Sequence, residues 1–283
     1  MFPLLLIAST LGITIQQVTR KAYNQKVKNA TFIFTALSVL CSLLVFVIIS
    51  GGKLNFVSEH IPYCIGFALS YSAASVATFL ALSTGPLSIT SLIIQYSLII
   101  PSIYGILFLN EPTSIALFIG LILLVISLLL VNLEDKTTEK KITLKWGIYV
   151  LISFIGNGAC STVQKVQQLK FGGEGKNEFM VIALLVSVTL IAVSALIFER
   201  KDIVVKIKTC PYLYVICGVS NGLVNLFVML LAVYPASIVF PVISASGIIL
   251  TALIGILFYK ERLSSKQIAG ICLGIASIVF LNL

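Results

Sequence analysis

Two sets of polar side chains lie at helical spacing inside runs that are otherwise apolar. They are Thr10, Thr14 and Gln17 near the start of the chain, and Asn157, Ser161 and Gln164 in its second half. Each set follows the spacing i, i+4, i+7, which places its members on one helix face. Hydroxyl and amide groups donate and accept hydrogen bonds, so such a face suits an uncharged polar ligand. The face could instead hold neighbouring helices together, but its recurrence in both halves favours a ligand cavity.

Other polar residues interrupt two further apolar runs, 61–110 and 209–259. They are Tyr71, Gln95, Tyr96, Asn221, Asn225 and Ser244. Asn221 and Asn225 are again four residues apart, and Pro101 and Pro241 lie close to the members of their own runs. Proline can open the backbone where a helix lines a cavity. We therefore predict that these six residues and the two repeated faces form a substrate site.

The residue types that most catalytic and metal sites need are scarce. His60 is the only histidine, and the six cysteines contain no C-x-x-C pair, so we predict neither a metal site nor a cofactor. The segment from Gly218 to Gly222 matches G-x-S-x-G, but it lies inside an apolar run without triad partners. No acid–base pair or activated nucleophile falls within the apolar runs, so the sequence does not indicate an enzyme.

The composition indicates an all-α integral membrane protein. Hydrophobic residues make up 59% of the 283 residues and charged residues 10%, against about 25% charged residues in soluble proteins. A mean hydropathy of +1.11 exceeds what a soluble core of this size could bury. The net charge of +9 is spread between apolar runs rather than along one face, so it does not indicate nucleic-acid binding. The lipid bilayer is the expected solvent.

The stretches without charged residues predict ten transmembrane helices. They cover 1–19, 29–52, 61–110, 112–133, 146–164, 179–198, 209–259 and 267–283. One span needs roughly 20 residues, so 61–110 and 209–259 must each hold two helices. Gly85-Pro86 and Tyr234-Pro235 mark the two turns. The first run has no basic leader and no A-x-A-like site, so we expect a retained helix rather than a signal peptide.

The basic residues predict the orientation of the chain. With ten spans, fifteen of the nineteen Lys and Arg residues fall in loops on one face, and the other four are Lys53, Lys165, Lys170 and Lys176. Basic loops stay in the cytoplasm, so both chain ends are expected outside. The expected location is the cell membrane, as a multi-pass protein of a bacterial inner membrane.

The chain contains an internal repeat. Pro86-Leu-Ser88, Gly105 to Phe108, Glu111, Gly120 and Asn132-Leu133 reappear as Pro235-Ala-Ser237, Gly255 to Phe258, Glu261, Gly270 and Asn282-Leu283. The offset is 149 residues at the start and 150 from the glycine onward. We expect two five-helix halves, residues 1–135 and 143–283, joined by a basic loop, 136–142. An odd number of helices per half gives inverted topology. Glu111 and Glu261 are expected to cap helix ends or to lie at the membrane interface. Gly120 and Gly270 are expected to pack the halves together, with homodimerisation as the alternative.

The repeated residues also carry a family resemblance. The segment from Gly255 through Tyr259-Lys260-Glu261-Arg262-Leu263, before the helix with Gly270, resembles the EamA-type branch of the drug/metabolite transporter superfamily. The region from Tyr234 to Leu283 is similar to the last two helices of the small multidrug resistance transporters. These relatives carry a carboxylate about two turns before a lysine, a place that Asn157 holds relative to Lys165. Exchange of a lipophilic cation for a proton at one buried carboxylate is therefore disfavoured.

The resemblance and the uncharged polar faces together predict a secondary transporter. We expect export of small neutral or zwitterionic metabolites of the amino-acid type, by alternating access between the two halves, in a monomer or homodimer. The alternative is a lipid-carrier flippase or a lipid-binding protein of the same fold. That alternative requires a lateral groove and polarity confined to one leaflet.

Overall fold

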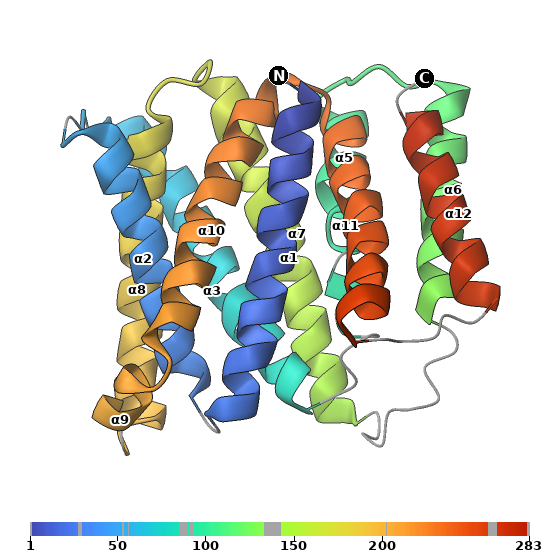
Figure 1. Ribbon diagram of the computed structural model, residues 1–283. Helices are drawn as coiled ribbons and strands as arrows, with labels where there is room; N and C mark the ends of the chain where they lie inside the picture. The colour runs from blue at the N-terminus through green and yellow to red at the C-terminus, as the bar shows by residue number, and fades with distance from the viewer. Residues whose placement is uncertain are drawn as a thin grey trace.

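The protein is a bundle of helices, as the computed structural model in Figure 1 shows. The structure describes residues 2–27, 30–52, 54–55, 57–84, 90, 93–94, 96–132, 143–201, 203–259 and 265–281. The helices in this part are α1 (Phe2–Lys26), α2 (Thr31–Ser50), α3 (Ile61–Thr84), α5 (Ile99–Phe108), α6 (Ile115–Asn132), α7 (Leu144–Lys170), α8 (Lys176–Phe198), α9 (Ile203–Lys208), α10 (Pro211–Leu230), α11 (Ala236–Tyr259) and α12 (Ser265–Leu281). Two short 3-10 helices, Ser58–His60 and Leu231–Val233, are also present. No strand occurs among the described residues.

Six described helices are long and apolar enough to span a membrane. They cover Phe2–Asn24, Thr31–Ser50, Ser58–Thr84, Leu144–Lys170, Lys176–Phe198 and Pro211–Val233. Shorter apolar helices, Ile99–Phe108, Ile115–Ser127, Ala236–Gly247 and Ile268–Leu281, fall within the other four predicted spans. The predicted all-helical membrane class agrees with this structure, while the full set of ten spans stays a prediction. The turn at Gly85-Pro86 and the loop 136–142 lie outside the described residues.

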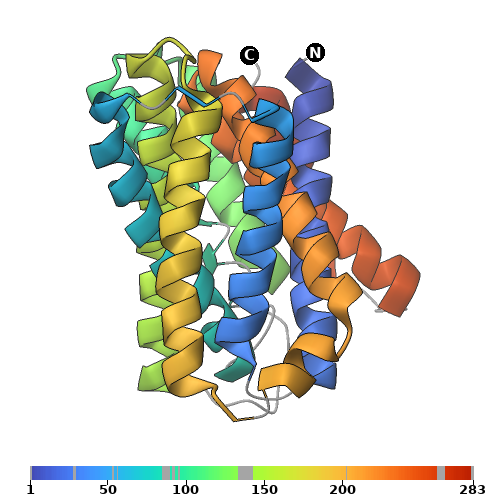
Figure 2. The same ribbon diagram turned by 90° about the vertical axis from the view of Figure 1, so that its left-hand side faces the viewer.

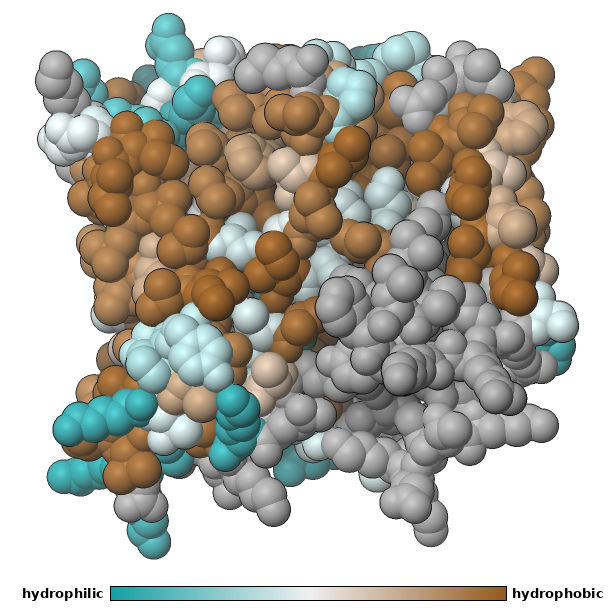
Figure 3. All heavy atoms as spheres, in the orientation of Figure 1, coloured by the Kyte–Doolittle hydropathy of each residue, from teal (hydrophilic) through white to brown (hydrophobic). Residues whose placement is uncertain are grey.

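The middle of the bundle presents apolar side chains outward. Leu44 and Ile48 of α2 are 50% and 76% exposed, and Leu185 and Leu196 of α8 are 54% and 60% exposed. Figure 3 shows the same feature as a brown belt, with hydrophilic residues gathered toward the two ends. Large exposed apolar surfaces of this kind are stable against lipid tails rather than water.

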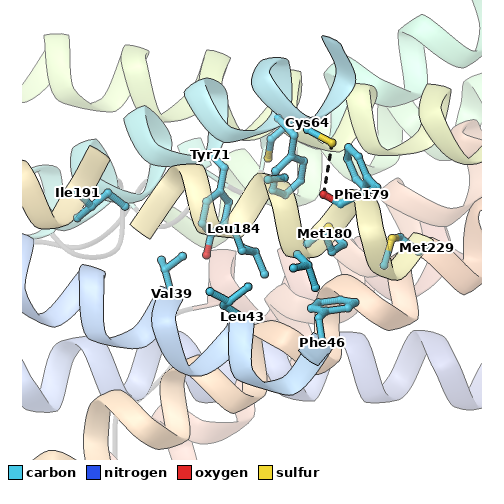
Figure 4. Close-up of a cluster of buried hydrophobic side chains, with 14 of the residues drawn as sticks. Val39, Leu43, Phe46, Cys64, Tyr71, Phe179, Met180, Leu184, Ile191 and Met229 are labelled. Carbon is cyan, nitrogen blue, oxygen red and sulfur yellow. Dashed lines mark hydrogen bonds between the residues drawn. The ribbon is translucent and has the colours of Figure 1, made fainter. Parts of the chain in front are cut away.

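The main apolar core joins α2, α3 and α8. Phe46, Phe67, Phe179 and Met180 are fully buried there (Figure 4). The thiol of Cys64 donates to the carbonyl oxygen of Phe179 at 3.6 Å, as expected for a cysteine that acts as a small buried side chain. Because α3 is fixed against α8 in this way, the core also fixes the position of the polar residues on α3.

The most extensive helix pairings join the two parts of the chain. α6 packs along α12, α3 along α7, α2 along α8 and α1 along α10. Between α6 and α12, the hydroxyl of Ser127 donates to the carbonyl of Gly270 at 2.6 Å, and that of Ser277 donates to the carbonyl of Gly120 at 2.8 Å. The predicted packing role of Gly120 and Gly270 is confirmed.

The helix directions place both chain ends at one end of the bundle (Figures 1 and 2). The short helix α9, the end of α1 and the start of α7 lie at the opposite end. One basic residue departs from the predicted loops, because α7 continues to Lys170 and therefore contains Lys165. Lys165 is only 5% exposed, so it belongs to the bundle interior and not to a loop.

The basic residues of the α9 end predict the orientation in a membrane. A reporter fused after Leu283 is expected to report an external C-terminus, because the basic loops remain in the cytoplasm. Reporter fusions within the loop between α8 and α10 serve as the internal control. A cytoplasmic signal from the Leu283 fusion would contradict this orientation.

Candidate functional site

A small cavity lies inside the bundle between α1 and α11. Its lining residues are Thr10, Ile13, Thr14, Gln17, Leu98, Ile243, Ser244 and Gly247. The predicted polar face of α1 thus meets Ser244 of α11, and none of the lining residues is charged. The cavity measures about 20 Å³, which is room for about one water molecule.

The polar groups of this cavity differ in how they are bonded. Thr10 and Thr14 donate to the carbonyl oxygens of Leu6 and Thr10, each at 2.9 Å within α1. A threonine hydroxyl bonded in this way can still accept a hydrogen bond. The side chain of Gln17 has no hydrogen-bond partner among the described residues, so its amide is available to a ligand.

A hydrogen-bond network centres on Asn221 of α10. The side-chain oxygen of Asn221 accepts from the hydroxyl of Tyr71 at 2.8 Å, from the hydroxyl of Ser42 at 3.1 Å and from the amide of Asn225 at 3.1 Å. Its amide nitrogen donates to the side-chain oxygen of Gln16 at 3.0 Å. The network therefore ties α1, α2 and α3 to α10.

Two predicted residues extend this network to α7. The amide of Gln164 donates to the carbonyl of Asn225 at 3.0 Å, and the amide of Asn225 donates to the carbonyl of Asn221 at 3.0 Å. Tyr71, Asn221, Asn225 and Gln164 are thus brought together.

The sequence prediction missed Gln16 and Ser42. Gln16 lies about 100° around the helix from the predicted face. Ser42 is a single serine without a spacing signal.

Three other predicted residues, Asn157, Ser161 and Tyr96, do not join the cavity or the network. Asn157 donates to the carbonyl of Ser153 at 2.9 Å, and Ser153 shares a 2.6 Å hydrogen bond with Thr78 of α3. Ser161 is half-buried on α7. The hydroxyl of Tyr96 donates to the carbonyl of Val125 on α6 at 3.1 Å, and Gln95 lies outside the described residues. The pairing of the two repeated faces around one ligand therefore stays a prediction.

A carboxylate caps the N-terminus of α11. The side-chain oxygens of Glu111 accept from the backbone amides of Ala236 at 2.7 Å and Ser237 at 2.9 Å, and from the hydroxyl of Ser237 at 2.8 Å. Negative charge is stabilised at a helix N-terminus by its unpaired amides and dipole. The capping role predicted for Glu111 is confirmed, whereas Glu261 lies outside the described residues.

Lys165 sits against this cap as its counter-charge. Its ammonium group is 3.6 Å from a side-chain oxygen of Glu111, and the two side chains are 5% and 9% exposed. The ammonium also donates to the carbonyls of Ala232, at 2.8 Å, and Tyr234, which end the preceding helix. One buried ion pair therefore fastens the turn between α10 and α11 to α7 and to the loop before α6.

The described residues contain no group of three His, Cys, Asp or Glu side chains that could hold a metal ion. Their buried polar side chains are amides, hydroxyls, the Glu111–Lys165 pair, the imidazole of His60 and the carboxylate of Glu199. Such groups can bind and release a polar solute, and they offer no evident covalent chemistry.

Comparisons with known proteins agree with this arrangement. A family model described as "Sugar transport protein" matches residues 112–282. Multidrug resistance protein EbrA of Bacillus licheniformis is 40% identical over 53 residues, which are 19% of this chain and 50% of EbrA, so the chain spans about half the length of this curated relative. One solved crystal structure has a TM-score of 0.77 at 12% identity, covering 99% of this chain and 98% of that one, which shows a shared fold.

The fold and these matches define an all-helical membrane protein of the transporter type. Because the family model covers more than half of the residues, the chain belongs to the sugar transport protein family.

Mutation of the Glu111–Lys165 ion pair tests how much this pair contributes to the free energy of unfolding. Replacing Glu111 with Gln leaves the buried charge of Lys165 without its counter-charge, so we expect the free energy of unfolding to fall by about 3–5 kcal/mol. The additional change Lys165→Met should restore part of this loss because the buried charge is then gone. Unfolding in detergent, followed by helix content, measures both effects.

Glu174→Gln provides the matched control, since Glu174 is exposed in the loop between α7 and α8. If Glu111→Gln and Glu174→Gln unfold alike, the ion pair does not stabilise the bundle.

Proposed function

We propose that this chain is a secondary transporter of ten transmembrane helices, built from two inverted five-helix repeats, residues 1–135 and 143–283. It belongs by this proposal to the drug/metabolite type and resembles the EamA branch. Its substrate is a small, uncharged or zwitterionic polar metabolite, which crosses the membrane by alternating access, in the direction of export.

Reciprocal hydrogen bonds between α6 and α12 support the repeat. Ser127 donates to Gly270 while Ser277 donates to Gly120. Both serines and both glycines are separated by 150 residues, which is the offset of the sequence repeat. Two elements related by a twofold axis make each contact twice with the roles exchanged. A pseudo-twofold axis between α6 and α12 accounts for this pair of bonds.

A second pair of close helix contacts has partners at the same offset, while the two glycines are 144 residues apart. A side chain at Gly12 of α1 would collide with Val224 of α10, and one at Gly156 of α7 would come within 2.9 Å of Ala74 of α3. Val224 and Ala74 are again 150 residues apart. Close approach of α1 to α10 thus matches close approach of α7 to α3, as inverted repeats require.

The small cavity supports alternating access. Its volume of about 20 Å³ admits about one water, so a metabolite enters only after α1 and α11 separate. Among the described residues, the corresponding helices of the other half are in contact, because Ile100 of α5 packs against Gly158 of α7. The α1–α11 pair therefore encloses a cavity while the α5–α7 pair is in contact. Such a difference between related helix pairs is expected when a transporter with two repeats is held in one of its two conformations.

The lining of the cavity carries the substrate proposal. Gln17 offers an unbonded amide beside the hydroxyls of Thr10 and Thr14, and the lining holds no charge. Amides and hydroxyls match the hydroxyls of a polyol or the paired charges of a zwitterion, and they cannot neutralise a full net charge. Membership of the sugar transport protein family favours a sugar within this class.

Transport by purified protein in liposomes tests the proposal. Exchange is measured against sugars, neutral amino acids and lipophilic cations, and we expect it for members of the first two groups. Gln17→Leu should raise the half-saturating substrate concentration by up to about a hundredfold, because one buried polar contact contributes about 1–3 kcal/mol.

Thr189→Val is the control for this experiment, since Thr189 lies on the lipid-facing side of α8. Unchanged kinetics in Gln17→Leu would move the site away from this cavity. Exchange of lipophilic cations alone would contradict the substrate class.

A further inference from the structure

A second, larger hollow lies on the side of the bundle, between α7 and α8. Its volume is about 290 Å³, close to the lower end of the roughly 300–1,000 Å³ usual for ligand pockets. Ala73, Val76 and Leu80 of α3 contribute to its floor, and Ile152 of α7 and Leu190 of α8 to its walls. Ala73, Ile152 and Leu190 are exposed, so the hollow opens toward the bilayer.

This hollow is separate from the proposed substrate cavity. The two share no lining residue, and the substrate cavity lies between α1 and α11 instead. From Ser72 to Leu80 the floor runs eight residues along α3, which is about 12 Å at 1.5 Å per residue. Most of its lining is aliphatic, so the shape and chemistry suit one hydrocarbon chain lying along a helix.

Positively charged side chains flank the end of the hollow that lies nearest the α9 end of the bundle. Tyr149 lines the hollow one turn after Lys145, whose ammonium lies 5.9 Å from the centre of the tyrosine ring. Arg200 and Lys201 follow the end of α8, six and seven residues after Ser194, which lines the hollow. The side chains of Lys145, Arg200 and Lys201 are all exposed.

One carboxylate, that of Glu199, lies near this rim, and its oxygens are already hydrogen-bonded within the protein. Glu199 is 8% exposed, and its oxygens accept from the backbone amides of Phe32 at 2.9 Å and Ile33 at 3.0 Å at the start of α2. Among the described residues, the exposed charges that remain near the rim are Lys145, Arg200 and Lys201. Asp202, next to Lys201, lies outside the described residues. A basic rim beside an apolar groove between membrane helices matches an anionic head group above its acyl chain.

We propose that this groove, defined by Ser72 to Leu80 of α3 and its walls on α7 and α8, binds one acyl chain of an anionic phospholipid. The phosphate contacts Lys145, Arg200 and Lys201, and the chain lies over Ala73 and Val76. The lipid is a bound component of the bundle and not the transported substrate, since the groove does not reach the α1–α11 cavity. This inference is independent of which metabolite is transported.

Ser72 allows an experiment to distinguish an acyl chain from a polar ligand in the groove. Ser72 lines the groove, and its hydroxyl oxygen is buried and has no hydrogen-bond partner among the described residues, with 8% of the residue exposed. An unpaired hydroxyl in an apolar site carries a cost that a polar ligand would relieve. An acyl chain makes no hydrogen bond, so the effect of removing this hydroxyl distinguishes the two occupants.

Native mass spectrometry of the purified, delipidated protein tests the site. The probes are phosphatidylglycerol and phosphatidylcholine of equal chain length, and we expect one phosphatidylglycerol to be retained in preference. Ala73→Phe fills the groove and should weaken retention by about tenfold, the effect of losing about two buried methylene contacts. Ala269→Phe, on the exposed side of α12, is the matched control and should change nothing.

Charge and hydroxyl variants complete the experiment. Combining Lys145→Gln, Arg200→Gln and Lys201→Gln should abolish the preference for phosphatidylglycerol, whereas Lys170→Gln with Lys176→Gln, at the other end of the bundle, should preserve it. Ser72→Ala should leave retention unchanged. Equal retention by Ala73→Phe and Ala269→Phe, or loss of retention in Ser72→Ala with no effect of the basic residues, would overturn the proposal.

Discussion

The hydrogen bonds around Asn221 pair polar side chains inside the bundle, and the arrangement of the surrounding helices depends on this pairing. Lipid offers no hydrogen-bond partners, so a polar side chain inside the bundle is stabilised when it finds one there. The side-chain oxygen of Asn221 accepts from Tyr71, Ser42 and Asn225, and its amide donates to Gln16. A change at Asn221 would leave several buried groups unpaired at once, whereas apolar packing alone would allow these helices to slide.

The same constraint explains where the two parts of the chain meet. The hydrogen bond between Tyr71 and Asn221 joins residues 150 positions apart. The reciprocal bonds Ser127–Gly270 and Ser277–Gly120 span 143 and 157 positions, equally far below and above the same offset. Contacts at this offset follow naturally if the two proposed repeats face each other across an axis. The differences then become informative, since α1 and α11 enclose a cavity while α5 closes onto α7 at Gly158.

One buried ion pair joins α7 to the N-terminus of α11. Glu111 caps α11 and pairs with Lys165, whose ammonium group also binds the carbonyls that end the preceding turn. The negative charge of Glu111 lies at a helix N-terminus and the positive charge of Lys165 lies at carbonyl groups that end a helix. Each charge is therefore stabilised by the helix dipole as well as by the other, which offsets part of the cost of burying both groups. The neutral cavity and the apolar lateral groove lie elsewhere, which keeps the two proposed binding sites chemically distinct.

The sequence by itself determined the properties that depend on local spacing and composition. The apolar runs gave the membrane class, the i, i+4, i+7 pattern placed Thr10, Thr14 and Gln17 on one face, and the position of Glu111 at a span end indicated a cap. Only the tertiary structure decided which residues these faces meet. Asn157 turned to Ser153 rather than to the cavity, Gln16 joined the network from outside the predicted face, and Lys165 entered the interior. Periodicity fixes the direction of a side chain about its own helix, but its partner depends on helix packing that brings distant segments together.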